Sequence, residues 1–108
     1  MSYSVKSIEV FEKQAKRLLK KYPSLKSELL VLIQLLKEYP TQGTPIGKSC
    51  YKIRLAIQSK GKGKSGGARV ITNVYISDEI VYLLNIYDKS EKDSLSKNEL
   101  EQLLAFLP

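Results

Sequence analysis

The residues of this 108-residue chain that are best suited to chemistry are basic. Two arginines stand in segments of β-forming residues and two lysines follow the last such segment, namely Arg54, Arg69, Lys89 and Lys92. An arginine can hold a phosphate through two parallel N–H···O bonds. A lysine that is crowded by other cations has a lowered pKa, which suits it to proton transfer. We therefore predict that Arg54 and Arg69 act on a phosphate and that Lys62, Lys64, Lys89 or Lys92 serves in proton transfer.

Other catalytic systems lack the residues that they need. The sequence has no histidine and one cysteine, Cys50, which leaves no Ser-His or Cys-His nucleophile and no zinc site. It also has no tight cluster of carboxylates for a hard cation, so we expect neither a metal nor another cofactor. The reaction that suits the remaining residues is metal-free cleavage of RNA by its own 2′-hydroxyl group. That reaction needs a base, an acid and cations around the phosphorus.

A polyanion is the partner that the charge distribution favours. Lysines and arginines outnumber acids by 18 to 11, and residues 39–77 hold no acid at all. Such a field attracts polyanions and raises their encounter rate, and in this central segment we favour nucleic acid over the alternatives of improved solubility or an acidic protein partner. We predict an RNA-binding surface that also uses stacking on a base, and its members are Lys52, Lys60, Lys62, Lys64 and Tyr87.

Two apparent nucleotide-binding motifs are rejected. Gly61–Gly66 matches G-x-G-x-x-G, but the dinucleotide fingerprint needs a helix to follow and the next residues favour a strand. Residues 47–49 and 63–65 each end like a phosphate-binding P-loop. The glycine that such a loop needs upstream is replaced by Gln42 in the first and by Gln58 in the second.

Helical periodicity predicts two helices near the start of the chain. Apolar residues recur at helical spacing over Glu9–Lys21 and again over Leu25–Glu38, and Ser24 is a candidate N-cap for the second helix. The connection is very short, so we expect an antiparallel helical hairpin. A capping box of Ser96 and Glu99 predicts a third helix near the C-terminus.

The rest of the chain alternates between strand and loop signals. Tyr3–Ile8 suits an edge strand, while Tyr39–Gly47 and Lys60–Gly67 are rich in glycine or proline and are predicted loops. Three further strands are predicted at Cys50–Ile57, Ala68–Ile76 and Ile80–Tyr87. The predicted class is α+β in the order β-α-α-β-β-β-α. We expect a small, largely antiparallel sheet with the helical hairpin packed on one face.

The sequence also predicts where the chain works. Its length suits a single domain over residues 1–108. The start has no secretory signal, no apolar run is long enough to span a membrane, and the lone cysteine cannot form a disulfide within the chain. These features favour the reducing cytoplasm.

Three motifs of the sequence are familiar when they occur together. They are Tyr51–Arg54 (YKIR), Lys60–Ile71 (KGKGKSGGARVI) and Tyr82–Lys92 (YLLNIYDKSEK). With the leading segment FEKQAKRLLKKYPSL, they resemble the HigB branch of the RelE/ParE toxin superfamily. The resemblance spans nearly the whole chain, and the glycine-lysine loop running into GG-x-R is its most specific part.

This resemblance implies a toxin of a type II toxin–antitoxin system with a RelE-like microbial RNase fold. Such toxins cut mRNA in the A site of the ribosome, against the 16S rRNA of the 30S subunit, without a metal. An antitoxin silences them, and in the HigB branch it usually carries a helix-turn-helix domain. The basic positions that match the family's active site are Arg54, Lys64, Arg69, Lys89 and Lys92, and of these the resemblance implies Arg54, Arg69, Lys89 and Lys92 as the catalytic residues. Some relatives use a histidine or tyrosine near the C-terminal end for proton transfer, and none follows Tyr87 here, so the general acid and base stay open.

Two other functions remain open at this stage. One is the gyrase-inhibiting branch of the same superfamily, which binds a protein and cleaves no RNA; the glycine-lysine loop argues against it. The other is a catalytically inactive module that binds RNA or the ribosome.

Overall fold

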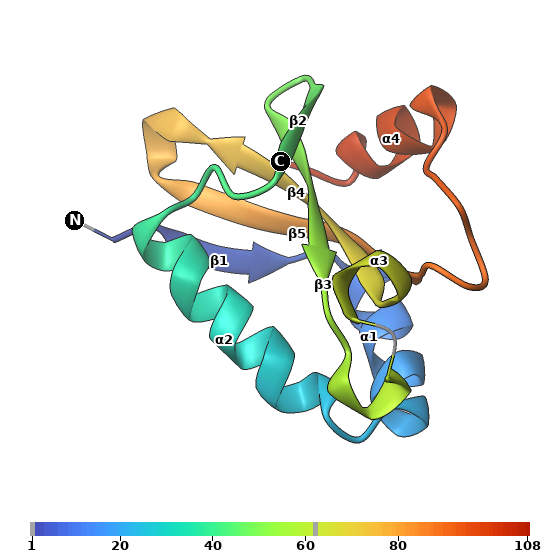
Figure 1. Cartoon of the computed structure of the whole chain (residues 1–108). Helices are drawn as coiled ribbons and strands as arrows, with labels where there is room; N and C mark the ends of the chain where they lie inside the picture. The colour runs from blue at the N-terminus through green and yellow to red at the C-terminus, as the bar shows by residue number, and fades with distance from the viewer. Residues whose placement is uncertain (1, 62) are drawn as a thin grey trace.

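The protein is built on one five-stranded sheet. The computed structural model describes residues 2–61 and 63–108, and of residues 64 and 65 it describes the backbone only. The strand order across the sheet is β1-β5-β4-β3-β2 (Figure 1). The strands are β1 (Ser4–Ser7), β2 (Thr44–Gly47), β3 (Cys50–Leu55), β4 (Ala68–Tyr75) and β5 (Ile80–Asp88). Only the β1–β5 pair is parallel, so the sheet is largely antiparallel as predicted.

The predicted helices and strands occur in the predicted order, and the structure adds β2 and the short helix α3 (Gly63–Gly66). The other helices are α1 (Glu9–Lys21), α2 (Leu25–Glu38) and α4 (Lys97–Leu104). Two 3-10 turns lie at Gln58–Lys60 and Ile76–Asp78. The capping box that opens α4 is confirmed, since Ser96 Oγ accepts a hydrogen bond from Glu99 N at 3.1 Å and Glu99 Oε1 accepts one from Ser96 N at 2.9 Å.

Two predicted loops contain regular structure. Part of Tyr39–Gly47 forms β2, despite its proline and glycine signals. β2 lies at the sheet edge, where Pro45 needs no partner for an N–H, and its pairing with β3 is irregular between Pro45 and Gly47. The Lys60–Gly67 loop includes α3. This helix is a single turn of four residues, so few glycines lose backbone entropy when it forms.

Ser24 stands at the predicted N-cap position of α2, but its side chain does not cap the helix. The backbone of Ser24 is already helical, with φ −77° and ψ −13°, whereas an N-cap residue is normally extended. Its hydroxyl instead accepts a hydrogen bond from Ser59 N at 2.9 Å and contacts Glu28 Oε1 at 3.1 Å. Glu28 in turn accepts a hydrogen bond from Gln58 N at 2.7 Å. The start of α2 therefore anchors the segment that leads into the glycine loop.

Each face of the sheet is covered by different helices. Leu32 and Leu35 of α2 line a groove with Ile53 of β3, so the helical hairpin packs on the face to which Ile53 points. Leu100 of α4 lines a pocket with Ile71 of β4, which points to the opposite face. In Figure 1, α2 and α4 lie on opposite sides of the sheet. The middle of β4 and β5 is consequently buried on both faces.

Among the described residues, no helix is both long enough and apolar enough to cross a membrane.

Candidate functional site

The register of the sheet brings the two predicted catalytic arginines together. Arg54 of β3 is the Cα partner of Arg69 of β4, and Arg69 is the partner of Tyr87 of β5. Residues that are directly opposite in a sheet point to the same face, with Cβ atoms about 5 Å apart. Lys52 lies two residues before Arg54 and therefore shares this face. We call the face around Arg54, Arg69 and Tyr87, which also bears α4, the site face.

The row of three side chains runs from exposed to buried. Arg54 at β3 is exposed, whereas Arg69 and Tyr87 are each 5% exposed. Arg69 Nη1 donates a hydrogen bond to the carbonyl of Ala68 at 3.0 Å, which helps to fix the direction of the guanidinium group. No described group makes a hydrogen bond to the buried Tyr87 hydroxyl. Burial raises the pKa of Tyr87, and the charges of Lys89, Arg69 and Lys92 offset part of that rise.

The two predicted catalytic lysines lie on the turn that follows β5. Lys89 Nζ donates to Asp93 Oδ1 at 2.8 Å, and Lys92 Nζ donates to Glu99 Oε2 at 2.6 Å. These hydrogen bonds lower the pKa of Asp93, and they lower the pKa of Glu99 to about 2. The Asp93 side chain is 95% exposed and the Glu99 side chain 42%. Exposed pairs of this kind are weak, so a phosphate can replace either carboxylate.

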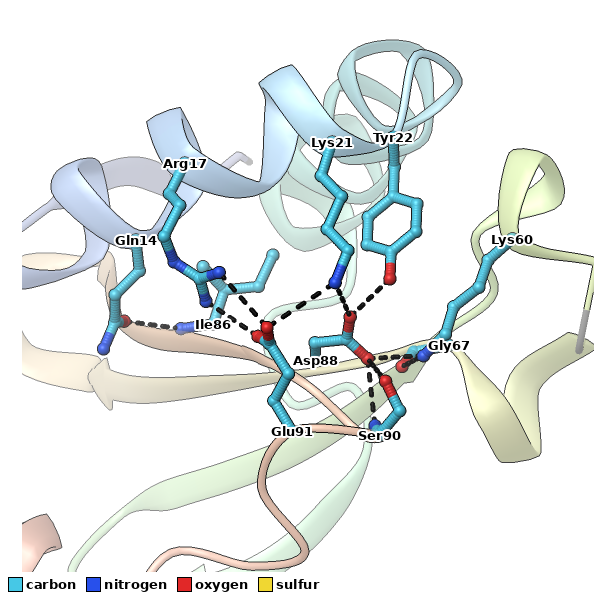
Figure 2. Close-up of polar contacts among 10 residues, drawn as sticks. All are labelled: Gln14, Arg17, Lys21, Tyr22, Lys60, Gly67, Ile86, Asp88, Ser90 and Glu91. Carbon is cyan, nitrogen blue, oxygen red and sulfur yellow. Dashed lines mark hydrogen bonds and ion pairs between the residues drawn. The ribbon is translucent and has the colours of Figure 1, made fainter.

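The opposite face holds a buried carboxylate, Asp88. Its side chain has no exposed surface and accepts hydrogen bonds from Tyr22 Oη at 2.5 Å, Ser90 N at 2.9 Å, Ser90 Oγ at 2.7 Å and Lys60 Nζ (Figure 2). Lys21 Nζ lies 3.7 Å away. Burial alone would raise the pKa of Asp88, but the hydrogen bonds from Lys60, Tyr22 and Ser90 outweigh it and hold the pKa well below its usual range.

The sequence and the fold of this chain match one known family. The model of a family described as the RelE toxin of the RelE/RelB toxin–antitoxin system matches residues 8–106. The chain belongs to the RelE toxin family. The HigB branch within the wider superfamily stays a prediction.

Solved structures of RelE proteins share the fold. An arginine double mutant of the E. coli toxin RelE in the free state has a TM-score of 0.67 at 15% identity, over 100% of both chains. The isolated E. coli RelE toxin gives 0.52 at 18% identity, covering 97% of this chain and 99% of that one. A chain of the toxin–antitoxin complex RelBE2 from Mycobacterium tuberculosis gives 0.61 at 13% identity, over 82% of this chain and 99% of that one.

This RelE-family chain brings two of its four predicted catalytic residues onto one face and places the other two in the turn beside it. Arg54, Arg69 and Lys52 share the site face, and the Tyr87 ring lies within the field of Lys89 and Lys92. No group of His, Cys, Asp or Glu in the described part of the chain could hold a metal ion.

The predicted RNA-binding residues are placed less uniformly in this RelE-family protein. Lys60 offers little surface to an RNA, because its side chain is only 7% exposed and its ammonium contacts Asp88 and the carbonyl of Gly67. We assign it to holding the base of the glycine loop. Lys62 and the side chain of Lys64 lie outside the described part of the structure.

Sequence reasoning gave no role to the acids of the last motif. Asp88 stands where an apolar strand ends, and Glu91 binds Arg17 Nη2 at 2.9 Å and Lys21 Nζ at 3.5 Å. Part of the basic charge of α1 is thereby neutralised. The available signal was an acid flanked by lysines directly after a buried strand, but its partner Lys60 is 28 residues away in the chain.

Proposed function

We propose that this RelE-family toxin is a ribosome-dependent endoribonuclease that cuts mRNA in the ribosomal A site without a metal. The observation that carries the proposal is a cluster of cations on the site face. Arg54 lies opposite Arg69 in the sheet, and the charges of Arg69, Lys89 and Lys92 act on the neighbouring Tyr87. A cluster of cations suits the bound phosphate of an RNA chain.

In the proposed reaction, the 2′-oxygen of the RNA attacks the adjacent phosphorus and the bond to the 5′-oxygen breaks. The products are a 2′,3′-cyclic phosphate and a 5′-hydroxyl. A base takes the proton of the 2′-hydroxyl, and an acid gives a proton to the departing 5′-oxygen. Arg54 and Arg69 bind the phosphate and stabilise the negative charge that grows on it in the transition state.

Lys89 and Lys92 supply further charge and proton transfer. Both ammonium groups are bound to surface carboxylates, Asp93 and Glu99, which the phosphate replaces when RNA enters. Lys52 lies one row along the site face and binds the neighbouring backbone phosphate or ribosomal RNA. Tyr87 provides the floor of this site.

The proposed partners are translating ribosomes in the cytoplasm and a cognate antitoxin with a helix-turn-helix domain. The RelBE2 structure contains a toxin–antitoxin complex of a protein with this fold. In this chain, α2 leaves Leu30, Val31 and Leu35 exposed beside the groove between α2 and β3. We propose that a segment of the antitoxin covers this exposed apolar strip.

The test is to map mRNA 5′ ends in a purified translation reaction with and without the protein. We expect new ends within codons at the A site, 5′-hydroxyl termini at the cuts, and no new ends with Arg69→Ala or Lys89→Ala. Ribosome binding without cuts would instead identify a catalytically inactive module. Inhibition of gyrase with intact mRNA would identify the gyrase-inhibiting alternative.

A further inference from the structure

We propose that Asp88 is a positioning residue for the two lysines of the site. Its carboxylate fixes the turn that carries Lys89 and Lys92 and ties that turn to the glycine loop. The inference rests on the proposed function, because it concerns how those lysines are placed for cleavage. Asp88 does not reach the substrate, since its side chain is fully buried and points to the face opposite that of Tyr87.

In the turn after β5, every backbone amide from residue 89 to residue 92 donates a hydrogen bond. The N–H of Lys89 donates to the carbonyl of Gly67 at 3.0 Å. The N–H of Ser90 donates to Asp88 Oδ1, and those of Glu91 and Lys92 both donate to the Asp88 carbonyl at 3.0 Å. Each amide from residue 89 to residue 92 thus ends on Asp88 or on the residue that closes the glycine loop. Such a turn has one preferred conformation.

The same carboxylate also joins segments that are distant in the chain. Lys60 precedes the glycine loop and binds both Asp88 Oδ1 and the carbonyl of Gly67, so the two ends of the loop meet beside Asp88. Tyr22 and Lys21, from the end of α1, reach the other carboxylate oxygen (Figure 2). A shift of the Asp88 carboxylate would therefore move the turn and the loop together.

The close approach of Gly67 to β3 restricts the loop further. A Cβ atom at Gly67 would lie 2.1 Å from the carbonyl oxygen of Leu55, a distance that no side chain can occupy. The loop end is pressed against β3 on one side and bonded to Lys89 and Lys60 on the other. These contacts fix the position of Lys89 relative to the sheet that carries Arg54 and Arg69.

Glu91 offers a matched control within the same turn. It is also an acid that binds cations of α1, at 2.9 Å from Arg17 and 3.5 Å from Lys21, but its side chain is 41% exposed. Exposed ion pairs contribute little, whereas removing one charge from a buried pair leaves the other uncompensated. Asp88→Asn and Glu91→Gln are equal in chemistry and differ in burial.

The experiment measures amide hydrogen exchange and single-turnover cleavage on programmed ribosomes for the full-length wild type, Asp88→Asn and Glu91→Gln. In Asp88→Asn, we expect the amides of Lys89 and Lys92 to exchange at least about tenfold faster, with that of Val70 in β4 unchanged. We expect the cleavage rate to fall about 10- to 100-fold at saturating protein, because a small misplacement of a catalytic group is costly. The protein concentration that gives half of the maximal cleavage rate should change less than about twofold, since the arginines on the strands stay in place. For Glu91→Gln, the exchange rates and the cleavage rate should both stay within about twofold of wild type.

The outcomes separate this inference from the proposed function. If Asp88→Asn leaves both the exchange rates and the cleavage rate unchanged, Asp88 does not position the turn. If the wild type cuts no mRNA, the proposed function fails, and the exchange rates still decide whether Asp88 fixes the turn. Should Asp88→Asn not fold, Tyr22→Phe removes one hydrogen bond to the same carboxylate and must give a smaller change in the same direction. An equal effect of Glu91→Gln would also overturn the inference.

Discussion

Tyr87 and Asp88 are consecutive residues at the end of β5, yet cations gather around both on opposite faces of the sheet. On the Asp88 side the chain supplies the negative charge itself, and the carboxylate is buried against Lys60. On the Tyr87 side the buried group is a neutral hydroxyl, and the acids that reach the two lysines lie at the surface. The first arrangement is complete within the fold. In the proposed function, the anion on the second side is the phosphate of the RNA.

The difference in burial gives the two clusters different uses. A buried ion pair is costly to break, because either ion is left without solvent or partner. It therefore suits a position that must not move, such as the join between the glycine loop and the Lys89 turn. An exposed ion pair exchanges partners readily, because water screens it. Lys89 and Lys92 can consequently leave Asp93 and Glu99 for a phosphate at little cost.

The largest expected effect comes from breaking the buried pair. Lys60→Met removes the buried cation that pairs with Asp88 and leaves the carboxylate buried with only Lys21 nearby as a cation among its described partners, so the free energy of unfolding should fall by about 3–5 kcal/mol. Chemical denaturation at neutral pH measures this change. The double variant Lys60→Met/Asp88→Asn should recover a large part of the loss, because no buried charge remains. A loss below about 1 kcal/mol in the single variant would mean that the Lys60–Asp88 pair contributes no more than an exposed ion pair, which would contradict the prediction.

A second prediction concerns acid. The pKa of Asp88 is lowered by folding, so its ionised form adds stability above the pKa of the unfolded chain, and this stability is lost as the pH falls toward the folded value. Wild-type unfolding free energy should therefore decline from about pH 5 downward. The decline should be shallower in Asp88→Asn, measured by urea titration at several pH values. Parallel curves for the two proteins would show that Asp88 does not contribute to acid sensitivity.

The two tyrosines give a smaller and sharper comparison. Tyr22→Phe removes a hydrogen bond to a buried carboxylate and should cost about 2 kcal/mol. Tyr87→Phe removes a hydroxyl that bonds to no described group and should change stability by less than about 0.5 kcal/mol. Thermal unfolding of both variants tests this. Equal losses of stability would mean that the Tyr87 hydroxyl also makes a stabilising hydrogen bond, which would contradict the contrast between the two tyrosines.

Local patterns in the sequence were enough to predict most of the fold. Helical spacing located α1 and α2, the Ser96–Glu99 box located α4, and apolar content located β4 and β5. The edge strand β2 was missed, because its proline and glycine are ordinary loop signals and its pairing partner lies in β3. Local patterns show only the preferences of one segment, whereas an edge strand such as β2 forms because it pairs with a neighbouring strand.

The site was predictable in part for the same reason. Arg54 and Arg69 stand on strands whose alternation fixes the face to which they point, so their partnership follows once the strands pair. Lys60 was placed on the RNA surface because composition counts charges without showing their partners. Its partner Asp88 comes from another segment, and only the fold brings the two together.

The central claim is that RNA is cut on the site face and not at the cluster around Asp88. The most direct measurement compares Lys89→Ala with Lys21→Ala, which each remove one positive charge, in single-turnover cleavage of mRNA on programmed ribosomes. Lys21 is half exposed and lies 3.7 Å from Asp88 on the opposite face. We expect Lys89→Ala to slow cleavage at least about 100-fold and Lys21→Ala to stay within about threefold of wild type. Equal losses in the two variants, or undiminished cleavage by Lys89→Ala, would contradict the account.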